Sequence, residues 1–306
     1  MSRAYWLNRN KILEKQVDAV ENKLARSVKR KYNSVMSEVK KDIASFYQEY
    51  ATQEGLTLKN AKKLLNKTEL SDFHERITAL KKQIKLTNNP ELVRKMNAMQ
   101  SRSKIQRLEA LYMDLETKVS QLGQYEQMKL TDYIIDTADD AAKFAFDTAQ
   151  TQTKITTTFS SLSDNAVKAI LDYPFYNGQN YSATIWNNRD FLAKATQRTV
   201  MQGIVQGDSY STMTKALQKR MDSNYYNTYR LIRTETTFTV QQAKKIGFEK
   251  AGLKKYEYVA IDDERSSDDY DELNGKIFLL KDAQPGVNFP PMRPNCRCDT
   301  IGYFKD

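Results

Sequence analysis

Residues 251–260, Ala-Gly-Leu-Lys-Lys-Tyr-Glu-Tyr-Val-Ala, mark the point where the chain changes from helix to sheet. Gly252 stands where a glycine commonly follows the last turn of a helix, and a helical pattern precedes it over about residues 224–251. After it, Tyr256 and Tyr258 stand two positions apart in an alternating pattern, which is typical of a strand. We therefore predict helices before this point and strands after it.

Two further strands are predicted downstream. The turn dipeptide Asn274-Gly275 precedes the apolar run Lys276–Leu280, and residues 296–303 can supply a third strand. Because the strands follow the helices instead of alternating with them, the fold class is α+β and predominantly α, with a small antiparallel sheet at the C-terminal end.

Long helices are predicted in the first half. Residues 8–50 carry apolar side chains at steps of three or four without Pro or Gly, which predicts one helix that ends near Gly55. Short helices are expected over 57–66 and after Ser71, and a second long helix over about 91–130 contains a heptad stretch. Two long helices joined in this way predict a hairpin or bundle, and a coiled coil between chains is an equal alternative.

The pattern divides the chain into three regions. We expect a basic long-helix domain over 1–150, a linker and turn-rich connection over 151–184, and an α+β module over 185–306. Within the module, helices are predicted over about 185–205 and over 212–221, the second capped by Ser211.

Positive charge is concentrated in the first region. Residues 1–130 hold 26 Lys and Arg against 15 Asp and Glu, whereas residues 131–306 hold 22 against 23. Segregated positive charge is typical of proteins that bind a polyanion, with nucleic acid the first candidate, although a solvated basic helix surface is the alternative. The candidate DNA-binding residues are Lys29, Arg30, Lys31, Lys40 and Lys41.

Several classes of protein are disfavoured. The chain has no run of eighteen apolar residues and no apolar signal segment, so we expect neither a membrane span nor a membrane partner, and a cytoplasmic origin. It has one histidine, His74, and neither a GxSxG nucleophile motif nor a P-loop. We therefore expect no catalytic residue and no cofactor.

Three polar clusters occupy the last quarter of the chain. They are Arg233–Thr237 on a helix, Asp262–Arg265 after a strand, and the tail Pro290–Cys298 with both cysteines. Carboxylates and guanidinium groups in separate elements predict an ion-pair network that fastens helix to sheet. Its expected members are Arg233, Glu235, Asp262, Asp263, Arg265 and Arg297.

Two acidic or sulfur-containing segments near these clusters carry side chains that can bind metal ions. The acidic loop over 262–272 lacks the glycine-centred spacing of an EF-hand. Cys296 and Cys298 supply two of the four ligands that a structural zinc site usually needs. We therefore expect no metal site, and the cysteines are expected to pack as small apolar groups.

The clusters, in their order and spacing, resemble the phage head morphogenesis family, the Mu F-like minor capsid proteins of tailed phages. The resemblance rests on Arg233–Thr237, Ala251-Gly252, Lys255–Tyr258, Asp262–Arg265, Leu273–Phe278, Pro290-Pro291 and Arg293–Cys298, and it covers about residues 185–300. The opening Tyr5–Arg9 is also similar to the start of such proteins. Two departures are Arg293, where members often have histidine, and Ser266–Asp268, where members often have cysteine.

The resemblance implies a protein present in few copies inside the procapsid, associated with the portal, with other capsid or scaffolding proteins and with double-stranded DNA without sequence preference. It implies a place in the virion, in the host cytoplasm during assembly, and a role in DNA packaging or ejection. The alternatives are an enzyme of ADP-ribosyltransferase type carried in the head, suggested by Arg233 and Glu235, and a coiled-coil scaffold unrelated to a virus, against which the tail cluster argues.

Overall fold

The computed structural model describes residues 3–53, 104–153, 155–175, 178–206, 208–260 and 272–304. Contacts divide the chain into two compact units, and the long helices contribute residues to both. Unit 1 is Met1–Lys29, Tyr125–Trp186 and Tyr226–Asp306, and unit 2 is Arg30–Gln124 and Asn187–Tyr225. These units interleave along the sequence, unlike the three consecutive regions expected from the sequence pattern, which remain a prediction.

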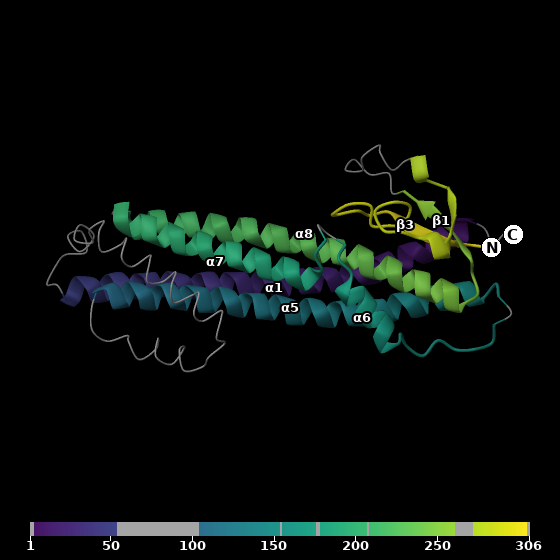
Figure 1. Cartoon of the computed structure of the whole chain (residues 1–306), viewed down its shortest axis with the longest axis horizontal. Coiled ribbons are helices and arrows are strands. Elements are labelled where there is room, and N and C mark those ends of the chain that lie inside the picture. Colours follow the sequence, from purple (N-terminus) through teal and green to yellow (C-terminus); the bar gives the residue numbers. More distant parts are fainter. Residues whose placement is uncertain are drawn as a thin grey trace. The chain divides into compact units, whose positions relative to one another are not determined.

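Helices dominate the described residues, and a small antiparallel sheet follows them, so the predicted α+β class is confirmed (Figure 1). In chain order the elements are α1 (Arg3–Gln53), α5 (Lys104–Gln150), α6 (Asp164–Asp172), α7 (Tyr181–Gln206), α8 (Tyr210–Lys250), β1 (Lys255–Val259), β2 (Ile277–Leu279), the 3-10 helix η2 (Leu280–Asp282) and β3 (Asp299–Tyr303). None of the helices in this part of the chain combines the length and apolarity needed to cross a bilayer.

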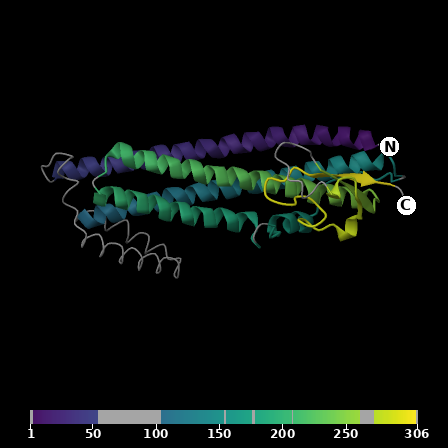
Figure 2. The ribbon, with the colours of Figure 1, turned by 90° about the horizontal axis from the view of Figure 1, so that it is seen from above.

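The described residues of unit 2 form four helix segments that run side by side (Figure 2). The apolar stripe predicted for α1 supplies part of its core, and the heptad stretch of α5 supplies another part. The buried side chains include Val35, Val39, Ile43, Leu115, Val119, Leu122, Leu192 and Leu217. These buried members of both helical stripes predicted from the sequence therefore face the interior of unit 2.

A buried polar group lies inside unit 2. Arg189 of α7 donates hydrogen bonds to Tyr32 of α1 and to Asn224 of α8, and Tyr32 donates to Asn224 at 2.7 Å. The guanidinium carbon of Arg189 also lies 5.1 Å from the centre of the Tyr32 ring. The group joins three helices through hydrogen bonds, which a polar side chain needs when it is removed from water.

One helix in this region was predicted wrongly. The helices expected over 212–221 and 224–251 are a single helix, α8, because the polar residues between them are satisfied inside the bundle: Asn224 is buried and donates to the carbonyl oxygen of Asn188 at 3.3 Å. The helix also begins earlier than predicted, and Ser209, not Ser211, accepts the capping hydrogen bond from the Thr212 amide at 3.1 Å.

In unit 1, α8 approaches α5 closely at Gly247. A Cβ atom added to Gly247 of α8 would lie 2.3 Å from the carbonyl oxygen of Ala142 and 2.9 Å from Cβ of Ala145, both on α5. The facing residues of α5 are small and fully buried, namely Ala138, Ala141, Ala142, Ala145 and Ala149. Small side chains on α5 and a glycine on α8 therefore allow the two main chains to touch.

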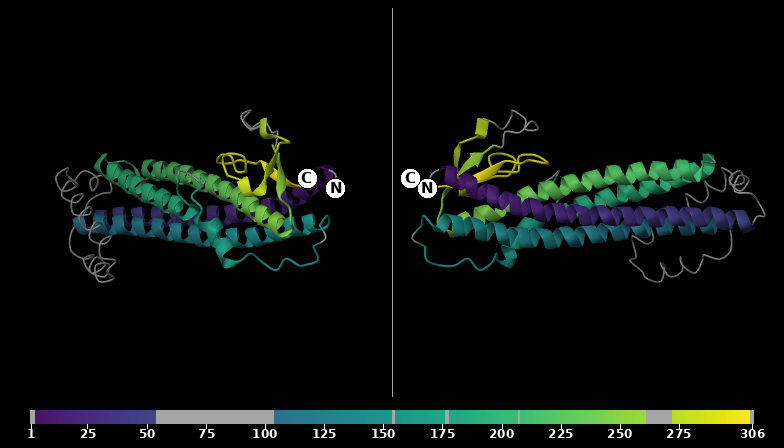
Figure 3. Two further views of the ribbon diagram at one scale, coloured as in Figure 1. Left: turned by 45° about the vertical axis from the view of Figure 1, so that its right-hand side comes forward. Right: turned by 180° about the vertical axis from the view of Figure 1, so that it is seen from behind.

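The sheet of unit 1 has the order β2-β1-β3, and both pairings are antiparallel. It lies beside the N-terminal part of α1 and the C-terminal part of α8 (Figure 3). At Gly302 of β3 a Cβ atom would lie 2.9 Å from the ring of Trp6 of α1, so glycine makes room for that ring. The edge strand β2 has three residues, and its Ile277 and Leu279 are exposed.

The turns predicted around the sheet are confirmed. Gly252 has a φ of 80° just after α8, and Gly275 has a φ of 77° before β2, the left-handed region that glycine adopts readily. The expected linker over 151–184 does contain irregular backbone, but it also contains α6, whose first turn is capped by Ser163. Gly55, the helices over 57–66 and after Ser71, and the start of the helix near residue 91 lie outside the described residues.

Two helical glycines offer a matched test of packing. Gly247→Ala should lower the free energy of unfolding by about 1–3 kcal/mol, because the added methyl meets the main chain of α5, which cannot move aside. In Gly203→Ala on α7 the added Cβ lies 3.0 Å from the flexible side chain of Met213, which can move. We therefore expect the free energy of unfolding to stay the same or to rise by up to about 1 kcal/mol, because alanine has the higher helix propensity. Urea unfolding of both variants measures the difference, and equal effects would contradict the close approach.

Candidate functional site

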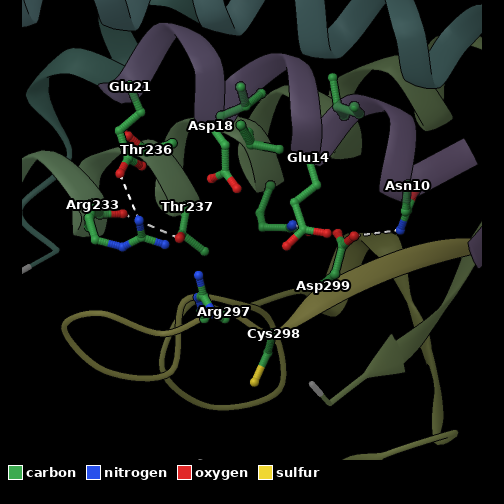
Figure 4. A pocket seen from close by; sticks show the side chains of 14 residues that line it. Asn10, Glu14, Asp18, Glu21, Arg233, Thr236, Thr237, Arg297, Cys298 and Asp299 are labelled. Atoms are coloured by element: carbon green, nitrogen blue, oxygen red, sulfur yellow. Dashed lines mark hydrogen bonds and ion pairs between the residues drawn. The ribbon is translucent and has the colours of Figure 1, made fainter. Parts of the chain in front are cut away.

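A charged pocket of about 80 Å³ lies within unit 1 (Figure 4). Its walls come from the first half of α1, the middle of α8 and the end of the tail. The residues that line it are Asn10, Leu13, Glu14, Val17, Asp18 and Glu21 of α1, Arg233, Thr236, Thr237, Val240 and Gln241 of α8, and Arg297, Cys298 and Asp299. The pocket thus unites the helical Arg-Thr-Glu-Thr-Thr cluster, the tail and a third segment almost 300 residues away from the tail in the sequence.

An ion pair forms one end of the pocket. Nη1 of Arg233 lies 2.8 Å from Oε1 of Glu21, whose side chain is 2% exposed. Burial raises the pKa of Glu21, and the nearby charge of Asp18 adds to this, although Arg233 acts in the opposite direction. Burial outweighs the attraction to Arg233, because removing the carboxylate from water costs more free energy than its interaction with one half-buried guanidinium group provides.

Two further carboxylates, Glu14 and Asp18, follow the same side of α1 at spacings of four and three residues from each other and from Glu21. The pKa of Glu14 is raised by burial first, then by the charges of Asp18 and Asp299, while Arg297 and Arg233 lower it. The charge of Arg297 therefore lowers the pKa of more than one acidic residue at the pocket, Glu14 and Glu21, and Arg297 does not pair with Glu235.

Threonine hydroxyl groups fasten the tail to α8. Thr237 Oγ1 donates to the carbonyl oxygen of Cys296 at 2.9 Å, and Thr234 Oγ1 accepts from the amide of Asn295 at 3.2 Å. Asn295 has a φ of 62°, a left-handed conformation that asparagine tolerates better than most residues. The threonines of the Arg-Thr-Glu-Thr-Thr cluster thus bind the turn that presents Arg297 to the pocket.

Glu235 lies apart from the pocket. It is 5% exposed, and among the described residues no cation pairs with it. Burial raises its pKa to about 8, so the side chain is mostly protonated at neutral pH. Glu235 also raises the pKa of Tyr181 at the start of α7, and both side chains are buried in unit 1.

The two cysteines lie at the base of the tail. Cys296 is buried against Tyr258 and Met292, and Cys298 is partly buried beside it, with its amide donating to Sγ of Cys296 at 3.4 Å. Hydrogen bonding from Cys298 lowers the pKa of Cys296 despite burial. Within the described ranges, no group of three or more His, Cys, Asp or Glu side chains is arranged to hold a metal ion.

The predicted site residues are only partly brought together. Arg233 and Arg297 line one pocket and Glu235 does not, while Asp262, Asp263 and Arg265 lie outside the described residues, so the full ion-pair network remains a prediction. The candidate DNA-binding residues all lie on α1: Arg30 and Lys41 are exposed, and Lys29, Lys31 and Lys40 are partly buried, Lys40 donating to Gln218 at 3.1 Å.

Sequence reasoning missed the acidic residues of α1. The apolar pattern places Val20 in the buried stripe after Val17, but Val20 is 50% exposed and the adjacent Glu21 is buried. Because Val20 completes the apolar step, the pattern gave no signal that a carboxylate would be buried here. The identity of the partner, Arg233, could not be found from spacing because 212 residues separate the two.

The raised pKa of Glu235 predicts a pH dependence of stability. The folded protein keeps the proton up to about pH 8, whereas the unfolded chain loses it near the ordinary value of 4.5. Between these values the free energy of unfolding should therefore fall as pH rises, by up to about 1.4 kcal/mol per pH unit from this group. Glu235→Gln should remove this component, and urea unfolding from pH 5 to 8 with wild type alongside measures it. Parallel curves for the two proteins would contradict the assignment.

Comparison with known proteins yields two matches. Part of the chain is 25% identical over 138 residues to the NAD(+)--arginine ADP-ribosyltransferase EFV of Enterococcus faecalis. The matched region covers 40% of this chain and 28% of that protein. No solved structure matches the chain. Residues 194–301 match the family described as Phage Mu protein F like protein, a range that includes the second half of α7, all of α8, β1, β2, the tail and the first three residues of β3. This segment therefore belongs to the Mu protein F-like family of phage head morphogenesis proteins, as the tail and the helical Arg-Thr-Glu-Thr-Thr cluster had indicated.

Proposed function

We propose that this protein is a minor capsid protein, present in few copies inside the procapsid, that associates with the portal and with packaged DNA and aids packaging or ejection. The observation that carries the proposal is the family match over residues 194–301, which contains most of the sheet and the tail that line the charged pocket. In this proposal the tail and the sheet are the segments that contact other head proteins. Hydrogen bonds to α8 and α1 hold these segments in one arrangement.

The basic face of α1 supports the DNA part of the proposal. Arg30 and Lys41 are exposed and stand eleven residues apart, close to three full helical turns, so they lie on one face of the helix. They project from the region that carries the whole positive excess of the chain. Charges of this kind contact phosphates without reading bases, which suits a protein that meets whatever sequence is packaged.

The enzyme alternative has one observation in its favour, the match to an ADP-ribosyltransferase over 28% of that protein. The residue suggested for catalysis is Glu235, which is 5% exposed and mostly protonated at neutral pH. A catalytic carboxylate must reach its substrate, and this one faces the helical interior. The head protein is therefore the better supported function.

Head composition tests the assembly role. Quantitative mass spectrometry of purified procapsids and DNA-filled heads should find the full chain in both, at a constant ratio to the portal protein and far below the copy number of the main shell protein. Absence from both particles would contradict the proposal, and so would a copy number equal to that of the shell protein.

Salt dependence tests the DNA role. The full chain should bind duplex DNA with an affinity that falls steeply with salt, and a variant lacking three charges of α1 should lower the slope of log affinity against log salt by about 2–3, since each phosphate contact contributes about 0.9. The variant is Arg30→Gln, Lys31→Gln and Lys41→Gln. The control removes the same number of charges from exposed lysines of unit 1, namely Lys254→Gln, Lys276→Gln and Lys281→Gln. Equal losses in both variants, or no binding at low salt, would contradict a DNA surface on α1.

A further inference from the structure

Lys244 is an amine enclosed by the protein at the junction of α8 and β3. Its side chain is 1% exposed, and its Nζ lies 2.5 Å from Oδ1 of Asp299 and 2.7 Å from the carbonyl oxygen of Thr300. The ring of Phe248 lies on another side, with its centre 6.0 Å from Nζ. Lysine is rarely buried this completely, and burial lowers the pKa of the amine although Asp299 raises it.

The carboxyl group of Asp299 is held at both oxygens. Oδ1 accepts from the side-chain amide of Gln241 at 2.6 Å and from the Thr300 amide at 2.7 Å, in addition to Lys244. Oδ2 accepts from the side-chain amide of Asn10 at 2.5 Å. The carboxyl group of Glu14 points toward Asp299 (Figure 4), and the charge of Asp299 contributes to the raised pKa of Glu14.

We propose that Lys244 and Asp299 condense into a side-chain amide, an isopeptide bond that joins α8 to β3. The bond forms between Nζ and Cγ, and the bond between Cγ and Oδ2 breaks. Starting from the ion pair, the group loses one molecule of water, whose oxygen is Oδ2 and whose two protons come from Nζ. No atom is oxidised or reduced, so no co-reactant is required.

The geometry matches each step of this condensation. An amine nitrogen at 2.5 Å from Oδ1 lies at most one carbon–oxygen bond length farther from Cγ, near the contact distance of about 3–3.5 Å from which bonds form. Gln241 and the Thr300 amide donate to Oδ1, where negative charge develops when Nζ attacks, as donors of an oxyanion hole do. Glu14 points toward Asp299, so the proposal gives it the role of passing a proton to the departing Oδ2.

Burial also favours the product over the ion pair. The buried amine of Lys244 and the carboxylate of Asp299, which is 22% exposed, lose much of their hydration, and their mutual attraction offsets this loss only in part. The amide carries no net charge, so its formation removes both ions from the interior. Its carbonyl oxygen keeps the hydrogen bonds from Gln241 and Thr300.

The intact mass of the purified full chain tests the proposal under denaturing conditions. The mass should lie below that of the sequence by one molecule of water, and a tryptic digest should contain a branched peptide that joins Lys244 to Asp299, without cleavage after Lys244. A mass equal to that of the sequence after prolonged incubation at neutral pH, with normal cleavage after Lys244, would overturn the proposal.

Variants distinguish formation of the isopeptide bond from other reactions that remove water. Lys244→Arg keeps a positive charge but cannot condense, so it should show the full mass. Asp299→Asn should lose ammonia in place of water, which an unrelated dehydration would not reproduce.

Glu14→Gln should slow the reaction and flatten its dependence on pH, whereas Asp18→Asn, on the same wall of the pocket, should not. Equal rates for these two would overturn the role of Glu14, and loss of water from Lys244→Arg would overturn the bond itself.

Discussion

Four hydrogen-bond donors converge on the carboxylate of Asp299, and the arrangement of unit 1 depends on them. They come from Asn10 of α1, Gln241 and Lys244 of α8, and the amide of Thr300 in β3 itself. Asn10 and Asp299 are 289 residues apart, so the contact closes nearly the whole chain into a loop. Because the entropy cost of closure grows only slowly with length, a compact polar junction can hold such distant segments together. Once β3 is fixed, the preceding turn reaches the threonines of α8, and Arg297 faces the pocket.

The charges of unit 1 show why the helical arginine lies beside α1. Glu21 is buried, and a buried carboxylate requires a cation or a proton. Arg233 supplies the cation from α8, while Glu235, two positions later, lies away from the pocket and holds its proton. Neighbouring acidic and basic residues on one helix thus meet different environments because successive positions point about 100° apart. The cluster serves the packing of helices and the seating of the tail, which agrees with a structural role in a head protein.

Most of the fold could be predicted from the sequence. The stripe of α1, the glycine after α8, the turn at Asn274-Gly275 and the three strands follow from local periodicity and turn chemistry, and the structure confirms them. The break predicted inside α8 failed because Asn224 is satisfied by Tyr32 and Arg189, which a local pattern cannot reveal. For the same reason the site was only partly predicted: Arg233 and Arg297 were identified, but their acidic neighbours lie more than 200 residues away on α1.

The shortness of β2 has a consequence for handling the protein at high concentration. An edge strand presents free main-chain groups on which the strand of another molecule can grow, and Ile277 and Leu279 would add apolar contacts to such a pairing. With three residues, β2 offers too few of these groups to support a lasting ladder between molecules. This edge of the sheet can therefore remain uncovered at high protein concentration without starting fibrous aggregation.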